Sequence, residues 1–308
     1  MSFKGLSPNV FEAFAPSKWS SMAYNLERMK AKDALTELAQ YSTDDLVGEL
    51  TGLARANSDE IPNITNQRKV DSLWVYWFRD TKERESLKSF LAKTPLDQST
   101  IFNIAPQDKH ATLAVIVREQ ELWVGLRIAP GAVVDRRNLA SKLEKSWLRE
   151  NLDDLIGDLP DGALIGFEDD PKIIDEATGG LDDFGARLAG KDSAWELGHT
   201  IAKEDAVELG ADLAEYVGRW LGVLAPVYRY AAWSAENDFI EATKKIQEEK
   251  AEKRRQARSY RSGDKVRIVS GLFAGKLGVV ESIDTKAQVK VRVGTMSVVV
   301  AGTDLVSA

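Results

Sequence analysis

The chain has 308 residues, of which 44% are hydrophobic, 29% are charged and none is cysteine. This length favours two domains and allows a large buried core. The lack of cysteine excludes disulfides, thiolate metal sites and cysteine nucleophiles, and with no signal peptide or membrane-spanning run in view we expect a cytoplasmic protein.

The net charge of -7 is unevenly distributed along the chain. Residues 241–308 include fourteen Lys or Arg and eight Asp or Glu, a balance of +6, so residues 1–240 carry -13. This division is typical of a protein in which only the basic segment meets a polyanion, because an acidic surface repels phosphate. The alternative is that the basic residues only keep a linker soluble.

The first half of the chain mixes helical and strand patterns. Apolar residues at helical spacing fill the first sixty residues, and the last of these sets is Leu46, Leu50 and Leu53. A strand-like run at 73–78 follows, and then a helix is predicted over Lys82–Ala92. Helix and strand therefore alternate irregularly from the start.

Two further β-rich runs, Ala111–Val117 and Leu122–Ile128, are joined by a short polar segment and predict an antiparallel hairpin. The earlier run at 73–78 has large side chains on both faces. Strand alternation separates Trp74, Tyr76 and Phe78 from Val75 and Trp77. We therefore expect both sides of that strand to be covered.

Beyond residue 135 the pattern is again mixed. Arg136–Leu152 has helical spacing, and the acidic, glycine-rich stretch 153–183 contains one apolar run, Ala163–Phe167. A strand at Trp195–Ile201 leads into two predicted helices, one from Lys203 or Glu204 to Val223 and one beginning at Pro226.

This mixture predicts an α+β body over residues 1–240, with a mainly antiparallel sheet flanked by helices. Residues 241–261 are almost wholly charged, with Glu and Lys at i,i+4 spacing, and predict a solvated helical connector. Residues 262–308 then return to a strand pattern and form a third segment.

The first strand of that segment alternates buried and cationic positions. Val266 and Ile268 would face a core, while Lys265 and Arg267 would face outward. Three glycines follow at points where a positive φ or a close backbone approach is needed, namely Gly271, Gly275 and Gly278.

A later strand repeats the alternation. Val289, Val291 and Val293 would face the core, and Lys290 and Arg292 would face outward. The valines at 298–300 would supply the last strand.

Residues 262–306 resemble the KOW motif of NusG-type transcription elongation factors and of KOW-bearing large-subunit ribosomal proteins. Gly-Asp-Lys-Val at 263–266, the Gly-x-Phe-x-Gly-Lys-x-Gly block at 271–278 and the apolar pair after it occur in the order and spacing of that motif. The resemblance implies a small all-β, SH3-like barrel. It also implies that RNA, the ribosome or RNA polymerase is the partner.

The resemblance further implies that Lys265, Arg267 and Lys276 lie near a partner contact. Phe273 could stack on a base, a contact worth roughly 1–3 kcal/mol, or could instead be a lid over the core. The other candidate binding residues are the outward cations and the arginines of the connector, namely Lys290, Arg292, Arg254, Arg255, Arg258 and Arg261. The alternative for all of them is a solvated surface.

The body shows no catalytic signature. His110 and His199 are its two histidines, so a multi-histidine metal centre is excluded, and no nucleotide-binding glycine loop is found. The acidic groups Glu168-Asp169-Asp170 and Asp182-Asp183 could hold Mg²⁺ or Ca²⁺, but ordinary acidic loops are the simpler interpretation. We expect no catalytic residue, metal or cofactor.

The body also has a weaker resemblance to an uncharacterised bacterial α+β family. The residues concerned are Phe3-Lys4-Gly5-Leu6, Trp123-Val-Gly-Leu and Pro226-Val-Tyr-Arg-Tyr-Ala-Ala-Trp. This resemblance implies a curved sheet flanked by helices and lends no catalytic residue.

Three hypotheses for function follow. The first is a non-enzymatic accessory factor in transcription or translation that docks through the KOW segment, while the acidic body contacts another protein. The second is an enzyme or small-ligand-binding body that KOW only targets, with chemistry around His110, His199 or Arg127. The third is a KOW segment used purely for protein interaction.

Overall fold

The computed structural model describes residues 3–92, 105–174, 181–190, 193–240, 260–269, 273–283, 288–301 and 304–307. The chain divides into two compact units, Met1–Ile240 and Glu241–Ala308, which we call the body and the C-terminal unit. Within the described ranges, every helix is too short or too polar to cross a lipid bilayer.

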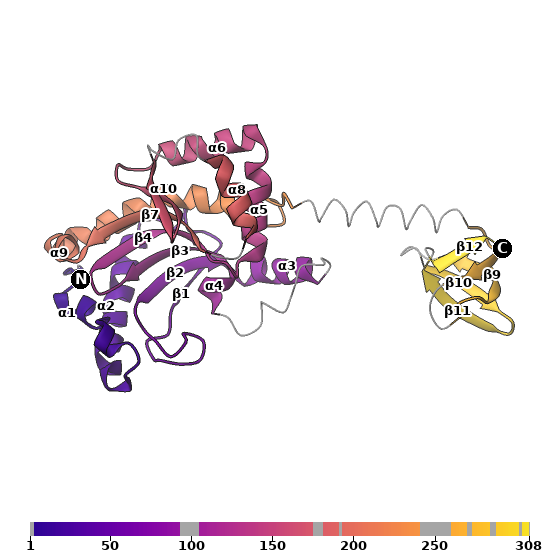
Figure 1. Ribbon diagram of the computed structural model, residues 1–308, viewed down its shortest axis with the longest axis horizontal. Helices are drawn as coiled ribbons and strands as arrows, with labels where there is room; N and C mark the ends of the chain where they lie inside the picture. The colour runs from indigo at the N-terminus through magenta and orange to yellow at the C-terminus, as the bar shows by residue number, and fades with distance from the viewer. Residues whose placement is uncertain are drawn as a thin grey trace. The chain divides into compact units, whose positions relative to one another are not determined.

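A seven-stranded antiparallel sheet forms the centre of the body, in the order β1-β2-β3-β4-β7-β5-β6 (Figure 1). Its strands are β1 (Leu53–Asn57), β2 (Leu73–Arg79), β3 (Ala111–Val117), β4 (Glu121–Ile128), β5 (Leu164–Phe167), β6 (Asp170–Ile173) and β7 (Trp195–Ala202). The predicted hairpin is confirmed, because β3 and β4 pair along their length from Ala111 opposite Ile128. The α+β, antiparallel character of the body is confirmed with it.

Helices surround this sheet. They are α1 (Pro8–Glu12), α2 (Asn25–Thr43), α3 (Thr81–Leu91), α4 (Pro106–Lys109), α5 (Val133–Leu143), α6 (Ser146–Gly157), α8 (Leu181–Ala189), α9 (Lys203–Glu208) and α10 (Leu213–Ala231), with short 3-10 helices η1 (Pro16–Lys18), η2 (Met22–Tyr24) and η4 (Gly210–Asp212). The two longest, α2 and α10, pack against each other and against the sheet.

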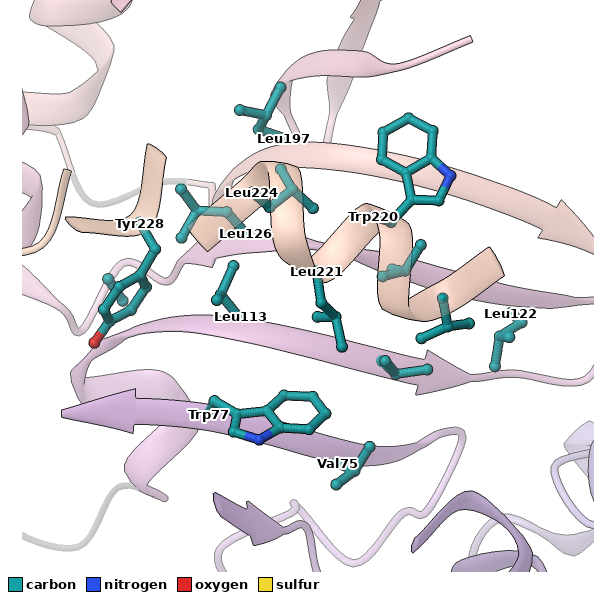
Figure 2. Close-up of a cluster of buried hydrophobic side chains, with 14 of the residues drawn as sticks. Val75, Trp77, Leu113, Leu122, Leu126, Leu197, Trp220, Leu221, Leu224 and Tyr228 are labelled. Carbon is teal, nitrogen blue, oxygen red and sulfur yellow. The ribbon is translucent and has the colours of Figure 1, made fainter. Parts of the chain in front are cut away.

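The main core lies between α10 and one face of the sheet. Leu221 of α10 points toward the strands that carry Trp77 and Leu113, whereas Trp220 points away from them (Figure 2) and stacks on His199 of β7. Apolar area removed from water stabilises the fold by about 25 cal/mol per Å², so burial of this layer stabilises the body.

A second cluster occupies the opposite face of the sheet, where Tyr76, Phe78, Ile116 and Trp123 are buried. The prediction that both faces of β2 are covered is therefore confirmed. The cover at Phe78 consists of the His110 ring, whose centroid lies 5.6 Å away, and the Arg84 guanidinium of α3.

Three local predictions were wrong. Leu53 begins strand β1 rather than ending a helix, because Gly52 adopts a φ of +80° that turns the chain. The single helix predicted over Arg136–Leu152 is two helices, since the extended backbone of Lys145 separates α5 from α6.

The third error concerns the two helices predicted after β7. The first is divided into α9, η4 and the start of α10, and Pro226 lies inside α10 instead of starting a new helix. A proline within a helix costs about 3 kcal/mol through its missing N–H and its steric clash. Leu224, Ala225, Val227 and Tyr228 around it are all buried, so packing against the sheet outweighs that cost.

The C-terminal unit contains a separate five-stranded antiparallel sheet in the order β11-β10-β9-β8-β12. Its strands are β8 (Lys265–Ile268), β9 (Leu277–Ile283), β10 (Gln288–Val293), β11 (Met296–Ala301) and β12 (Leu305–Ser307). The valines at 298–300 are in a strand as predicted, but they are not in the last one, because β12 follows and pairs with β8.

Candidate nucleic-acid interface

The strands of the C-terminal unit separate apolar from cationic side chains. In β8, Val266 and Ile268 are buried while Lys265 and Arg267 are exposed. In β10, Val289 and Val291 are buried and the alternating Lys290 and Arg292 are exposed. Because successive side chains of a strand point to opposite faces, the sheet has an apolar inner face and a cationic outer face.

Three exposed cations belong to β8 and to the turn before β9. Arg267 pairs with Leu277 across the two strands, and the carbonyl of Lys276 accepts a hydrogen bond of 2.9 Å from the Ile268 N–H. Among the residues that the structure describes, no carboxylate forms an ion pair with Lys265, Arg267 or Lys276. We call these three residues the open cluster.

The two cations of β10 have a different environment. Lys290 Nζ lies 3.8 Å and Arg292 Nε lies 3.9 Å from the carboxylate of Glu281. Ser297 Oγ donates a hydrogen bond of 2.7 Å to the same carboxylate. We call Lys290 and Arg292 the shared cluster, because one negative charge already lies between them.

Two glycines have the roles predicted for them. Gly275 has a φ of +82° in the turn before β9, where a side chain would strain the backbone. A Cβ on Gly278 would lie 2.8 Å from the Arg292 carbonyl oxygen, so only glycine fits beside β10. Gly271 lies outside the described residues.

Phe273 is half-buried and packs against the core of the unit. This contact is the one that the lid interpretation predicts. Its carbonyl accepts a hydrogen bond of 3.1 Å from the Lys276 N–H, so the turn that holds Phe273 also positions Lys276. Stacking of Phe273 on a base stays a prediction.

Tyr260 and Arg261 are the first described residues of the C-terminal unit. Tyr260 is buried, and its hydroxyl donates a 2.7 Å hydrogen bond to the Leu305 carbonyl. Arg261 is exposed, with its backbone N–H bound to Asp264 Oδ2 at 2.6 Å. The predicted connector cations at 254, 255 and 258 lie outside the described residues.

Residues 262–293 match the family model of the KOW motif, and we therefore call the C-terminal unit the KOW unit from here on. KOW motifs are common in RNA-associated proteins, which links this unit in a general way to nucleic-acid machinery. A comparison of the whole chain with curated proteins finds no match. The predicted KOW resemblance is thus confirmed, while the weaker likeness of the body stays a prediction.

Sequence reasoning did not predict the exposed apolar residues that lie beside Arg267. Arg267 is flanked across the sheet by Leu277 and Val306, whose exposed fractions are 57% and 53%. Strand register alone creates this arrangement, and the register depends on which strand returns to pair with β8. The ion partner Glu281 was missed for a similar reason, because a bulge in the β9–β10 pairing places it beside Lys290.

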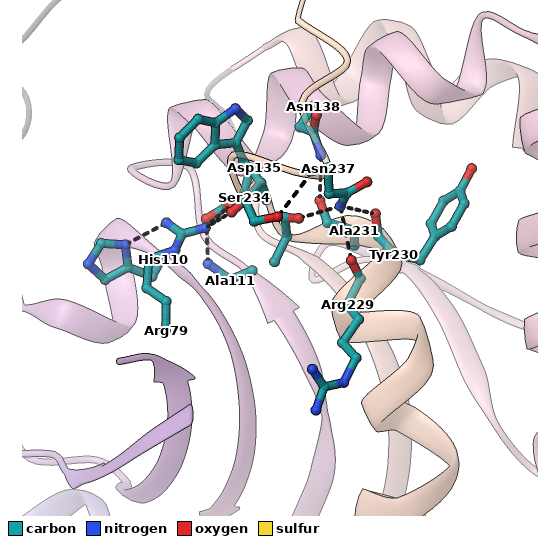
Figure 3. Close-up of polar contacts among 12 residues, drawn as sticks. Arg79, His110, Ala111, Asp135, Asn138, Arg229, Tyr230, Ala231, Ser234 and Asn237 are labelled. Atoms are coloured by element: carbon teal, nitrogen blue, oxygen red, sulfur yellow. Dashed lines mark hydrogen bonds and ion pairs between the residues drawn. The ribbon is translucent and has the colours of Figure 1, made fainter. Parts of the chain in front are cut away.

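His110 belongs to a buried network rather than to an open site (Figure 3). Its Nδ1 lies 3.0 Å from Arg79 Nη1, and Arg79 forms a buried ion pair with Asp135. Burial, with the positive charge of Arg79 second, lowers the pKa of His110 to about 4. The ring is therefore a neutral group held against Arg79.

The same network holds the end of the body in place. Asp135 accepts hydrogen bonds of 2.8 Å from the N–H groups of Ala111 and Trp233. One helical turn further along α5, Asn138 accepts the N–H of Phe239 at 2.9 Å. These contacts fix the segment that leads out of the body.

His199 lies within β7 and stacks on Trp220 at 4.8 Å between ring centroids. Its Nδ1 lies 3.0 Å from the Gly162 carbonyl. Among the residues that the structure describes, the side-chain partner of His110 is Arg79 and that of His199 is the Gly162 carbonyl, and neither histidine forms a hydrogen bond with a serine or a carboxylate as a hydrolytic triad requires.

The acidic residues after β5 are paired with arginines. Arg187 lies 2.8 Å from Asp169 and 3.1 Å from Asp170, and Arg127 lies 3.5 Å from Glu168. In the part of the chain that is described, no group of three or more His, Asp or Glu side chains is arranged to hold a metal ion. Side-chain positions of Asp182 and Asp183 are outside the description.

Proposed function

We propose that this protein is a non-enzymatic accessory factor of transcription or translation that docks through its KOW unit on RNA or on a nucleic-acid machine, the ribosome or RNA polymerase. It acts in the cytoplasm, and its acidic body, with a charge of -13, contacts a protein partner. The open cluster is the observation that supports this function. Its cations are exposed and free of described carboxylates, so their charge is available to a polyanion.

The architecture that we propose has three parts: the body over 1–240, a helical connector over 241–261 and an SH3-like barrel over 262–308. The barrel is supported by the pairing of β12 with β8 and by a core that gathers side chains from four strands, including Val266, Val280, Val291 and Leu305. The connector would add the positive charge of Arg254, Arg255 and Arg258 to that of the C-terminal unit.

The test is the salt dependence of RNA binding by the full chain. Affinity for a single-stranded RNA is measured by fluorescence anisotropy between about 50 and 200 mM salt, where each phosphate contact contributes about -0.7 to the slope of log K against log salt. The variant K265E/R267E/K276E should reduce that slope by about 2, because three contacts are lost.

A matched control separates a specific face from overall charge. K30E/K82E/K88E makes the same change in net charge at exposed lysines of the body. It should leave the slope near that of the wild type. Equal loss of binding in the two triple variants, or no loss in either, would contradict docking through the open cluster.

A second candidate is a KOW unit that binds protein alone, and the exposed Leu277 and Val306 beside Arg267 favour it. Apolar side chains gain from burial against a protein surface, whereas an RNA backbone offers phosphate and sugar. Co-sedimentation of the full chain from lysate, with and without RNase, distinguishes these partners. RNase-resistant association that is abolished by L277S/V306S would favour the protein partner.

A further inference from the structure

An open groove of about 550 Å³ lies in the body between η2 and the loop that joins β1 to β2. Its apolar lining consists of Met22 from η2 and of Pro62 and Ile64 from the loop. Arg68 is the only charged residue among its described lining residues, so no carboxylate is among them. We call it the Ile64 groove. It is an apolar site with a single positive charge.

A row of exposed apolar side chains continues this surface along the start of α2. Met22, Leu26 and Met29 follow one another at spacings of four and three residues, which places them on one face of a helix. Their exposed fractions are 57%, 59% and 47%. Methionine adapts its shape to a partner, and two of the chain's four methionines are in this row. The row, which we call the Met22 row, has the spacing that packing against a second helix requires.

The loop presents Ile64 to water in a fixed backbone conformation. Asn63 Oδ1 accepts the N–H of Thr65 at 2.8 Å, and Asn66 Oδ1 accepts the N–H of Asn63 at 2.8 Å. The two residues after Asn66 have φ of +54° and +61°, a region that side chains disfavour. Ile64 is nevertheless 85% exposed. Because the loop is already ordered, a partner that covers Ile64 does not have to order it on binding.

Arg68 leaves its positive charge available in the groove. Within the described ranges, no carboxylate forms an ion pair with it. The glutamates of α2 and of the loop are already neutralised, since Glu27 lies 2.7 Å from Lys18 and Glu60 lies 2.6 Å from Lys32. A carboxylate of a partner would therefore meet no competing acid in the groove.

These charges distinguish the occupants that an apolar surface can have. A second copy bound through a two-fold axis would bring a second Arg68 and no carboxylate. An anionic bilayer would be repelled by the body, whose residues 1–240 carry -13. A protein with an apolar face and carboxylates beside it complements both the apolar lining and Arg68.

We propose that the Ile64 groove and the Met22 row bind an amphipathic helix of a partner protein, which has large apolar side chains on one face and a carboxylate that pairs with Arg68. The helix lays its apolar face along the row and into the groove. This inference rests on the part of the proposed function that gives the acidic body a protein partner. It is independent of docking through the KOW unit.

Fluorescence anisotropy of labelled helical peptides, titrated with the full chain, tests the proposal. The glutamate probe has leucines at i, i+3, i+4 and i+7 and two glutamates beside them on an otherwise neutral helix. The lysine probe replaces the glutamates with lysines, and the serine probe replaces the leucines with serines. The glutamate probe should bind saturably, the lysine probe about ten-fold more weakly and the serine probe not at all.

Paired serine variants then locate the surface. M22S/I64S removes two exposed apolar side chains and should weaken binding of the glutamate probe by about ten-fold or more. V47S/I173S is the matched control, because it removes exposed apolar side chains from other parts of the body. It should change affinity by less than about two-fold.

A charge reversal tests the role of Arg68. R68E should weaken binding of the glutamate probe by about ten-fold and strengthen binding of the lysine probe, so that the order of the two affinities is inverted. K88E makes the same change at an exposed lysine of α3 and should preserve the wild-type order.

The outcomes are distinct. Absence of saturable binding by the glutamate probe overturns the proposal, and so does an unchanged order of affinities in R68E or equal weakening by M22S/I64S and V47S/I173S. Dimerisation in analytical ultracentrifugation that M22S/I64S abolishes would overturn it in favour of a second copy. Binding to phosphatidylcholine and phosphatidylserine vesicles that M22S/I64S abolishes would overturn it in favour of a membrane.

The KOW variant separates this inference from RNA docking. K265E/R267E/K276E should bind the glutamate probe as the wild type does, because the open cluster is not part of the groove. Loss of probe binding in that variant would place the probe on the KOW unit and overturn the inference. Failure of RNA binding alone would leave the peptide result unchanged.

Discussion

The body and the KOW unit use charged side chains in opposite ways. The body buries Arg28, Arg79, Asp135, Arg136 and Lys142, each at 3% exposure or less. In the described part of the KOW unit, every buried side chain is apolar except the Tyr260 phenol, and the cations are outside. Buried cations serve the fold of the body, whereas the exposed cations of the KOW unit remain available to a partner.

Arg136 illustrates the difference. It donates hydrogen bonds to the carbonyls of Leu188 at 3.0 Å and Ser193 at 2.7 Å, so backbone oxygens satisfy its buried guanidinium. Arg267 has the same side chain on an open strand and makes no such contact among the described residues. Charge counted along the sequence does not distinguish these two situations.

The largest expected effect is in the body. D135N leaves the Arg79 guanidinium buried without its counter-charge, and breaking a buried pair in this way costs about 3–5 kcal/mol. Urea unfolding followed by tryptophan fluorescence should show this loss in the free energy of unfolding. R79M/D135N should recover part of it, because no unpaired charge remains.

The exposed variant D44N is the control for that measurement and should change the free energy of unfolding by less than about 0.5 kcal/mol. A loss below about 1 kcal/mol in D135N would contradict the view that buried charges hold the body together.

The next largest effect is a pH dependence at His110. Its pKa is lowered to about 4 in the fold, so between pH 6.5 and 4 the unfolded chain binds a proton that the native chain does not. His110 therefore contributes about 3 kcal/mol to the free energy of unfolding above pH 6.5, and this contribution is lost as the pH falls toward 4. H110Q keeps an acceptor for Arg79 and should lose correspondingly less stability in urea titrations over the same range.

If wild type and H110Q lose the same stability on acidification, the assignment of His110 as a buried, neutral side chain is wrong. The carboxylates of the chain titrate in both proteins, so the difference between the two curves isolates the histidine.

Sequence patterns predicted β2, β8 and β10, because a run of large apolar residues or an alternation of valine and cation is a strong local signal. They missed β1, β6 and β12, which are short and lack such a pattern. They failed at Pro226, where the core around Leu224 and Tyr228 outweighs a local helix-breaking preference. Local patterns cannot include this contribution, since the packing partners are on β3 and β4, about a hundred residues earlier.

The candidate sites also include some features that local sequence patterns predict and others that only the fold reveals. Lys265 and Arg267 could be placed on an outer face from alternation alone, and the structure places them there. The grouping of Met22 with Ile64 and Arg68 could not be predicted, because a 3-10 helix and a loop from separate parts of the chain bring them together. Sequence reasoning treated Met22 only as one of several apolar residues at helical spacing.

A smaller effect should distinguish the two cation clusters of the KOW unit. K265E/R267E removes two open charges, while K290E/R292E removes two that already share Glu281. The first variant should lose about 1–2 kcal/mol of RNA binding, roughly ten-fold in affinity, and the second should lose less. Anisotropy at one fixed salt concentration measures both, and an equal loss would show that Glu281 does not screen its neighbours.

The smallest effect concerns Tyr260, the first described residue of the KOW unit. The Tyr260 hydroxyl donates to the Leu305 carbonyl at 2.7 Å, and Leu305 starts β12, a strand of three residues that pairs only with β8 among the described strands. Y260F keeps the buried ring and removes this bond, which is worth about 1 kcal/mol.

Hydrogen exchange in the full chain is the suitable measurement, because it reports the opening of each unit separately. Amides of β8 and β12 should exchange about five-fold faster in Y260F, while those of α10 keep their wild-type rates. Y24F, which alters a tyrosine of the body, should leave the KOW amides unchanged. Unaltered exchange of β12 in Y260F would mean that its pairing with β8 alone holds it, and that the end of the connector contributes nothing to the stability of the KOW sheet.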